Sequence, residues 1–205
     1  WASSSAGTGT IELDAGEFRV NPAEVIVGDV TVNDQATLGG SGAVSGAVTV
    51  LQGGVLSPGF SPGVLNTGNL DLNGFLQIDI AGDQPAGDPN GYDQINVTGT
   101  VSIDSSLSFD FFGLMPAELS VGQTFTIIDN DSDDDVQGAF RLLPEGFAVA
   151  TNVAGSGLDL EISYVGGDGN DVVLTVVPGT TIEIVGNDLV VTDAGRGTSD
   201  DNLTF

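Results

Sequence analysis

The sequence predicts an all-β protein: a right-handed parallel β-helix (a solenoid) followed by a β-rich cap or a small antiparallel β domain. Three observations lead to this fold class. Apolar and polar residues alternate in short stretches, Gly is frequent (31 of 205 residues), and five similar segments recur in the first half of the chain. Alternation directs every second side chain to one face of a strand, and Gly permits tight turns between strands. Because 40% of the residues are apolar, the chain can also bury a core.

Each recurring segment reads apolar-x-apolar, then a polar or Gly turn, then a second apolar stretch. The segments start 19, 18, 22 and 31 residues apart, at Ile11, Val30, Val48, Leu70 and Val101. A unit of this length cannot bury its own apolar face, so successive units must stack, and one unit suits one coil of a β-helix. A β-sandwich of hairpins also alternates and turns, and it is the alternative fold.

In a stack of this kind, the first strands of successive units lie side by side in one parallel sheet. Their aligned apolar residues should then face inward: Val30, Val32, Val48, Val50, Leu70, Leu72, Val101 and Ile103. The last interval is longer because residues 81–92, rich in Gly, Pro, Asp and Asn, interrupt it. We expect that stretch to form a surface loop.

Three regions follow from the change of pattern along the chain. Residues 1–120 form the β-helix repeats, residues 121–178 a β-rich cap, and residues 179–205 a terminal strand–turn–strand with a polar tail. The last region is either the start of a next unit or an assembly strand. In the second region a strand is predicted at 123–129, followed by antiparallel strands at 138–142, 148–153, 158–164 and 172–177. Such strands would cover the open end of a solenoid.

Charge limits the partners. The chain has 29 acidic residues and 3 Arg, for a net charge of -26. This surface repels phosphate backbones and anionic lipids, so we expect no nucleic-acid partner, and it attracts divalent cations. No run of 18 apolar residues exists, so no membrane insertion is expected. The first residue is Trp1 rather than Met, which predicts a processed chain or an excised segment.

Missing residue types argue against an enzyme. The chain has no His, Cys or Lys, which removes Ser–His and Cys–His nucleophilic sites, Schiff-base chemistry and the usual ligands of catalytic zinc. Carboxylates remain for general acid–base work. A carbohydrate-binding or carboxylate-dependent carbohydrate-cleaving β-helix is therefore the alternative to a non-enzymatic role.

Three segments resemble motifs of autotransporter-associated β-strand repeat proteins, in the same order along the chain. They are 53–63 (GGVLSPGFSPG), 92–99 (YDQINVTG) and 162–174 (ISYVGGDGNDVVL). The resemblance covers about residues 30–177, and Phe60 departs from it because that position is usually small or polar. It implies a β-helical piece of a large secreted bacterial surface protein, often an adhesin or passenger region. It carries over no catalytic residue.

Two segments predict calcium ligands. Segment 166–174 (GGDGNDVVL) fits the calcium nonapeptide pattern, with Asp168 and Asp171 as candidate ligands. Those repeats bind calcium between stacked copies, so a Gly-rich turn is the alternative for a single copy. The acidic loop 129–135 offers hard oxygen donors from Asp129, Asp131 and Asp133, and a solvated loop without metal is its alternative. A third set surrounds the inserted loop: Asp83, Asp88, Asn90 and Asp93.

The sequence as a whole predicts a non-enzymatic extracellular structural or adhesive module of a bacterial surface protein or extracellular filament. Calcium is the expected cofactor. The expected partners are a second copy or neighbouring modules, and surface glycans. Repeat-like segments near both ends, 11–20 and 182–191, predict head-to-tail assembly by strand addition. The alternative is that both segments pair within their own chain or with the next module of a longer polypeptide.

Overall fold

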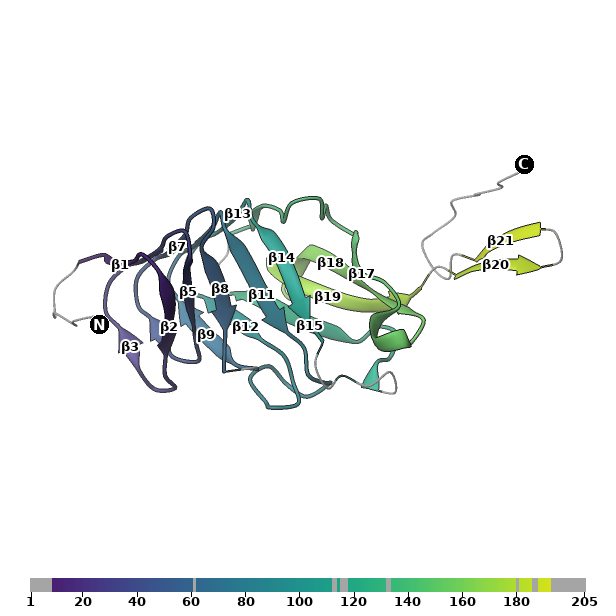
Figure 1. Ribbon diagram of the computed structural model, residues 1–205, viewed down its shortest axis with the longest axis horizontal. Helices are drawn as coiled ribbons and strands as arrows, with labels where there is room; N and C mark the ends of the chain where they lie inside the picture. The colour runs from purple at the N-terminus through teal and green to yellow at the C-terminus, as the bar shows by residue number, and fades with distance from the viewer. Residues whose placement is uncertain are drawn as a thin grey trace.

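The computed structural model describes residues 9–60, 62–111, 114, 118–131, 134–179, 181–185 and 188–192. These residues form β-strands joined by turns and loops, with short 3-10 segments and no α-helix among them (Figure 1). The all-β prediction is therefore confirmed. No helix in this described part of the chain is long and apolar enough to cross a membrane.

Three parallel sheets, stacked in order along the chain, make up most of the molecule. The first contains β1 (Ile11–Leu13), β4 (Val30–Val32), β7 (Val48–Val50), β10 (Leu70–Leu72), β13 (Val101–Ile103) and β16 (Gln137–Gly138). The second contains β2 (Gly16–Val20), β5 (Ala36–Gly40), β8 (Val55–Pro58), β11 (Phe75–Asp79) and β14 (Ser106–Asp110). The third contains β3 (Val25–Ile26), β6 (Ala43–Val44), β9 (Val64–Thr67), β12 (Gln94–Val97) and β15 (Thr124–Asn130). The chain visits the three sheets in turn, so each pass adds one strand to each sheet (Figure 1).

The first sheet has the register that the repeat predicts. Val30 pairs with Val48, Val48 with Leu70, and Leu70 with Val101, and a second row lies two residues further along each strand. All eight residues predicted to face inward lie in these two rows and are at most 3% exposed. Because the neighbouring strands run parallel, the alternative of a sandwich of hairpins is wrong for this part of the chain.

The second and third sheets add apolar rows to the same core. Their register aligns Phe18, Leu38, Leu56, Leu76 and Leu107 in the second sheet, and Leu65, Ile95 and Ile128 in the third. Phe18 and Leu107 are only partly buried because they lie on the outermost strands of their sheet. Each fully buried side chain of this size stabilises the fold by about 1.5–3 kcal/mol.

The pairing changes from parallel to antiparallel at β15. One edge of this strand pairs parallel with β12, and the other pairs antiparallel with β19 (Asp171–Pro178). Two more antiparallel strands follow, β18 (Leu158–Gly166) and β17 (Ala148–Ala150). The antiparallel pairing predicted for 148–153, 158–164 and 172–177 is confirmed, whereas the predicted strand at 123–129 is the last parallel strand of the third sheet. The division of the chain at residues 120 and 178 stays a prediction.

The antiparallel strand predicted at 138–142 is wrong. Gln137–Gly138 instead pairs parallel with β13 and begins a sixth pass through the first sheet. Gly138 has φ +85°, and a Cβ at this position would overlap the carbonyl oxygen of Ile103. Only Gly allows the backbone to approach β13 this closely.

The loop over residues 81–92 is closed at its base by the residues that directly follow β11 and precede β12. Ile80 and Tyr92 form an antiparallel bridge, and the N–H of Ala81 donates to the carbonyl of Gly91 at 2.8 Å. The Tyr92 ring meets the edge of Phe125 at a centroid distance of 5.2 Å. The inserted loop therefore leaves the parallel register of the flanking strands intact.

The predicted strand–turn–strand near the end of the chain is confirmed as an antiparallel hairpin, β20 (Thr181–Val185) and β21 (Asp188–Thr192). It pairs with no other strand of the described residues, and in Figure 1 it lies beyond β17 and β18. At the other end, β1 pairs with β4. Both segments predicted to assemble thus pair within their own chain. The polar tail lies outside the described residues.

Candidate functional site

The two predicted calcium-binding segments lie together at one end of the third sheet. β15 ends in Asp129 and Asn130, and β19 starts at Asp171 on the neighbouring antiparallel strand. Asp131 directly follows β15, and Asp168 lies in the turn that joins β18 to β19. Asp133 lies outside the described residues. The sequence suggested two separate sites, and the antiparallel pairing of β15 with β19 brings them to one junction.

The Asp171 carboxylate joins β19 to β15 at this junction, because it accepts a hydrogen bond from a backbone N–H group. This carboxylate accepts the N–H of Asn130 at 2.8 Å. Burial raises the pKa of Asp171, the N–H groups of Asn130 and Asp168 lower it, and the carboxylates of Asp129 and Asp168 raise it further. Gly167 has φ +55°, and a Cβ there would overlap the Asp171 carboxylate. The Gly-rich turn is therefore wrapped around a carboxylate that joins it to β15.

Two amide side chains, which sequence reasoning did not single out, fix the acidic loop. Asn130 Nδ2 donates to the carbonyl of Asp134 at 2.8 Å, and Asn170 Nδ2 donates to the same carbonyl at 3.3 Å. Both Asn residues are buried. They lie next to predicted ligands in the sequence, but their shared acceptor is known only once β15 and β19 are paired.

The described residues include no group of three or more acidic side chains arranged to hold a metal ion. Calcium therefore stays a prediction, and the feature that supports it is that the carboxylates of Asp129 and Asp168 both repel that of Asp171 and raise its pKa. A divalent cation would relieve this repulsion.

Calcium is expected to raise the melting temperature of the full chain, because it would bind the folded junction better than the unfolded chain. Magnesium should raise it less, since it prefers a tighter octahedral site. The measurement is thermal unfolding at low salt with calcium, magnesium or a chelator. Asp129→Asn should reduce the calcium effect, and Asp14→Asn, on the exposed surface, is the control. The same melting temperature with calcium and with chelator would contradict the prediction.

A second buried carboxylate, Asp93, closes the corner between β11, β12 and the loop before β9. Its Oδ1 accepts the N–H of Gly63 at 2.7 Å, and its Oδ2 accepts the N–H of Asp79 at 3.0 Å. The side chain is 0% exposed. Burial raises the pKa of Asp93 to about 7; the two N–H donors and Arg19 lower it, and the Asp79 carboxylate raises it.

The third predicted set does not come together around a ligand. Asp88 accepts the N–H of Asn90 at 2.9 Å and Asp83 accepts Gln84 Nε2 at 2.7 Å, both on the exposed loop. Asp93 lies inside the protein. The loop carboxylates hold local turns, and Asp93 holds the corner from which the loop departs.

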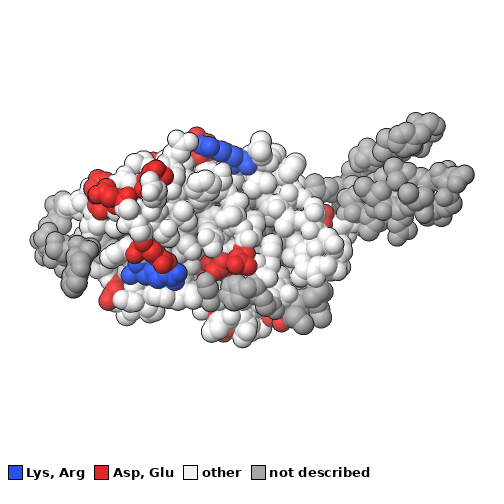
Figure 2. All heavy atoms as spheres, in the orientation of Figure 1, with Lys and Arg blue, Asp and Glu red and all other residues white. Residues whose placement is uncertain are grey.

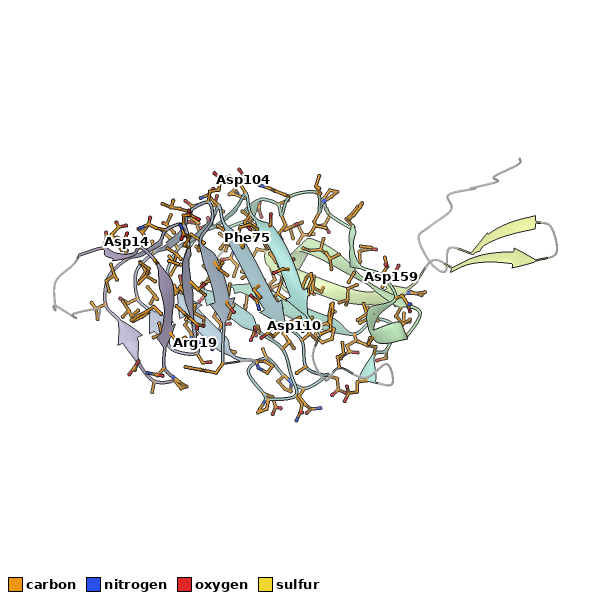
Figure 3. The ribbon with its side chains drawn as sticks, in the orientation of Figure 1. Asp14, Arg19, Phe75, Asp104, Asp110 and Asp159 are labelled. Atoms are coloured by element: carbon orange, nitrogen blue, oxygen red, sulfur yellow. The ribbon has the colours of Figure 1, made fainter. Side chains whose placement is uncertain are left out.

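Arg19 lies at the margin of the second sheet and is engaged on three sides. Its Nε donates to Glu17 at 2.6 Å, its Nη1 donates to the carbonyl of Gly59 at 3.2 Å, and its guanidinium lies 5.2 Å from the centroid of the Phe60 ring. Phe60, the position that departs from the resembled family, thus serves as a platform for this Arg. Figure 3 labels Arg19 beside the strands of the second sheet.

Comparison with models of known protein families gives no match, and neither does a search of curated protein sequences. The resemblance to autotransporter-associated β-strand repeats therefore stays a prediction.

Proposed function

We propose that the stacked sheets form one right-handed parallel β-helix, and that this rod is a non-enzymatic, extracellular structural or adhesive module. The observation that supports this role is the register of the apolar rows, which continue through successive passes of the chain. Each pass contacts only its neighbours, so the fold extends in one direction and presents long side faces. The net charge of -26 keeps such a surface hydrated and soluble.

The carboxylates with a raised pKa serve the fold. Asp93 and Asp171 are buried, and their oxygens accept backbone N–H groups. A catalytic pair would need two carboxyl groups on either side of a reachable sugar bond. These two positions support a structural role better than the carbohydrate-cleaving alternative.

Carbohydrate binding, in contrast, is favoured by a specific observation. Phe75 is 46% exposed on the outer face of the second sheet, and its ring offers a flat apolar surface on which the C–H face of a sugar can stack. Adhesion through a glycan is therefore the second candidate, and it is compatible with a structural rod.

The structural role predicts that copies of the chain assemble by strand addition, and this assembly can be tested. Among the described residues, the hairpin β20–β21 has two outer edges, and β1, β2 and β3 each pair on one side. A hairpin from one copy therefore has edges to add to in the next. Such a contact does not close on itself and builds a filament. Higher ionic strength should favour it, because it screens the repulsion between copies.

Electron microscopy and light scattering of the full chain are expected to show filaments at high ionic strength, and a chain without residues 180–205 should stay monomeric. Unchanged filaments after this deletion would exclude the hairpin as the donor strand. A full chain that is monomeric at every ionic strength would contradict assembly altogether.

A further inference from the structure

The outer face of the second sheet carries an uncharged strip in a strongly acidic protein. The outward positions at the centre of this face are Thr37 and Gly39 on β5, Val55 and Ser57 on β8, and Phe75 and Gln77 on β11. The strip ends at the next alternating position of β11, Asp79, which is 5% exposed. The sheet lies toward the viewer in Figure 1, and most of the surface over these strands is free of charged residues in Figure 2. With 29 acidic residues in the chain, an uncharged strip between the charged margins of this face suggests a surface with a role of its own.

The strip has a regular geometry. Thr37 pairs with Val55, Val55 with Phe75, and Phe75 with Ser106, so one row crosses four strands. Adjacent strands are about 4.8 Å apart, which makes the row roughly 14 Å long. This length accommodates a short stretch of an extended oligosaccharide. Phe75 provides an exposed ring within the row, and Ser and Thr hydroxyls and the Gln77 amide lie in the same row and in the neighbouring one.

The charged residues at the margins of the strip determine which ligand charge is compatible with it. At β2 the only cation is Arg19, which is already paired with Glu17. Asp110 lies at the end of β14, on the other side of the strip (Figure 3). An anionic ligand would meet a net charge of -26 with no unpaired cation on the described part of this face. The partner that fits is therefore uncharged.

The composition of the strip also argues against a protein partner. Val55 and Phe75 are its only large apolar residues, and stable protein interfaces need an apolar centre and a buried area of about 1,200 Å² or more. Sugar ligands, in contrast, use one aromatic ring and several hydrogen-bonding groups, because they carry both C–H faces and hydroxyls.

We infer that this strip binds a neutral polysaccharide, with Phe75 as the stacking residue and Gln77 among its hydrogen-bonding groups. The inference rests on the proposed structural and adhesive role, and it specifies the ligand class of that role. It does not involve the hairpin or the strand edges, so binding and assembly can fail independently.

The experiment is a pull-down of the full chain with insoluble neutral polysaccharides (cellulose, chitin and β-glucan) and, for comparison, affinity electrophoresis in gels containing alginate. The protein is expected to bind at least one neutral polysaccharide and not to be retarded by alginate. Phe75→Ala should weaken binding about tenfold. Phe147→Ala is the matched control, because Phe147 is 48% exposed outside the strip.

Equal melting temperatures of the two variants would show that both retain the fold. Three results would overturn the inference: no binding to any neutral polysaccharide, equal retention by alginate, or the same loss in Phe147→Ala as in Phe75→Ala. In each case filament formation at high ionic strength could still be observed, so the structural role would be judged separately.

Discussion

Val50→Asp is expected to destabilise the protein by at least about 3 kcal/mol, because it places an unpaired charge in an apolar row. Val50 is 0% exposed and lies in register between Val32 and Leu72. Thr49→Asp adds the same charge one residue earlier, on the outward side of the same strand, and should cost less than about 1 kcal/mol. Urea unfolding followed by circular dichroism measures both values.

A Val50→Asp chain that does not fold at all would leave no transition to measure. The pair Val50→Ala and Thr49→Ala then serves, with an expected loss of about 2 kcal/mol for the first and little for the second. Equal losses at the two positions would contradict the inward direction of the row.

The pH profile of stability is expected to depend on Asp93. The pKa of this carboxyl is about 7 in the folded protein and about 3.9 in an unfolded chain, so the folded state holds the proton more tightly. The resulting stability is complete below about pH 4 and is lost as the pH rises through 7. The full change corresponds to roughly 4 kcal/mol for about three pKa units.

Asp93→Asn should flatten this profile between about pH 4 and 7, the window between the unfolded and the folded pKa, because the amide does not titrate. At the acidic end it should also lower the stability by about 1–3 kcal/mol, since its NH₂ group would face one of the two backbone N–H donors. Asp14→Asn removes an equal charge from an exposed position and should keep the wild-type slope. A wild-type slope in Asp93→Asn would show that other groups cause the pH dependence.

The parallel sheets could be predicted because their information is local. Alternation within three residues fixes the inward direction of a strand, as at Val48 and Val50, and the spacing of the units fixes which strands are neighbours. The pairing of the segment after residue 120 was harder to predict from the sequence. At 138–142 the apolar pattern suited an antiparallel strand equally well, and the parallel pairing there depends on contact between Gly138 and Ile103, 35 positions earlier.

The candidate sites were also hard to predict where they depend on contacts between residues far apart in the sequence. The acidic residues of both calcium segments were visible in the sequence, yet their junction requires the pairing of β15 with β19. Asp93 could be seen within a motif, but its role comes from a donor 30 residues away, at Gly63. The uncharged strip is spread over strands about 20 residues apart, and it becomes visible only when these strands lie side by side.

The two different edges of β15 have a consequence for how this molecule can vary. Its parallel edge accepts a pass like those before it, whereas its antiparallel edge is occupied by β19. A duplicated pass placed between β6 and β7 would therefore add one strand to each parallel sheet while leaving the contacts of the first and last strands unchanged. Evolution can in this way change the length of the parallel sheets independently of the antiparallel strands that follow β15.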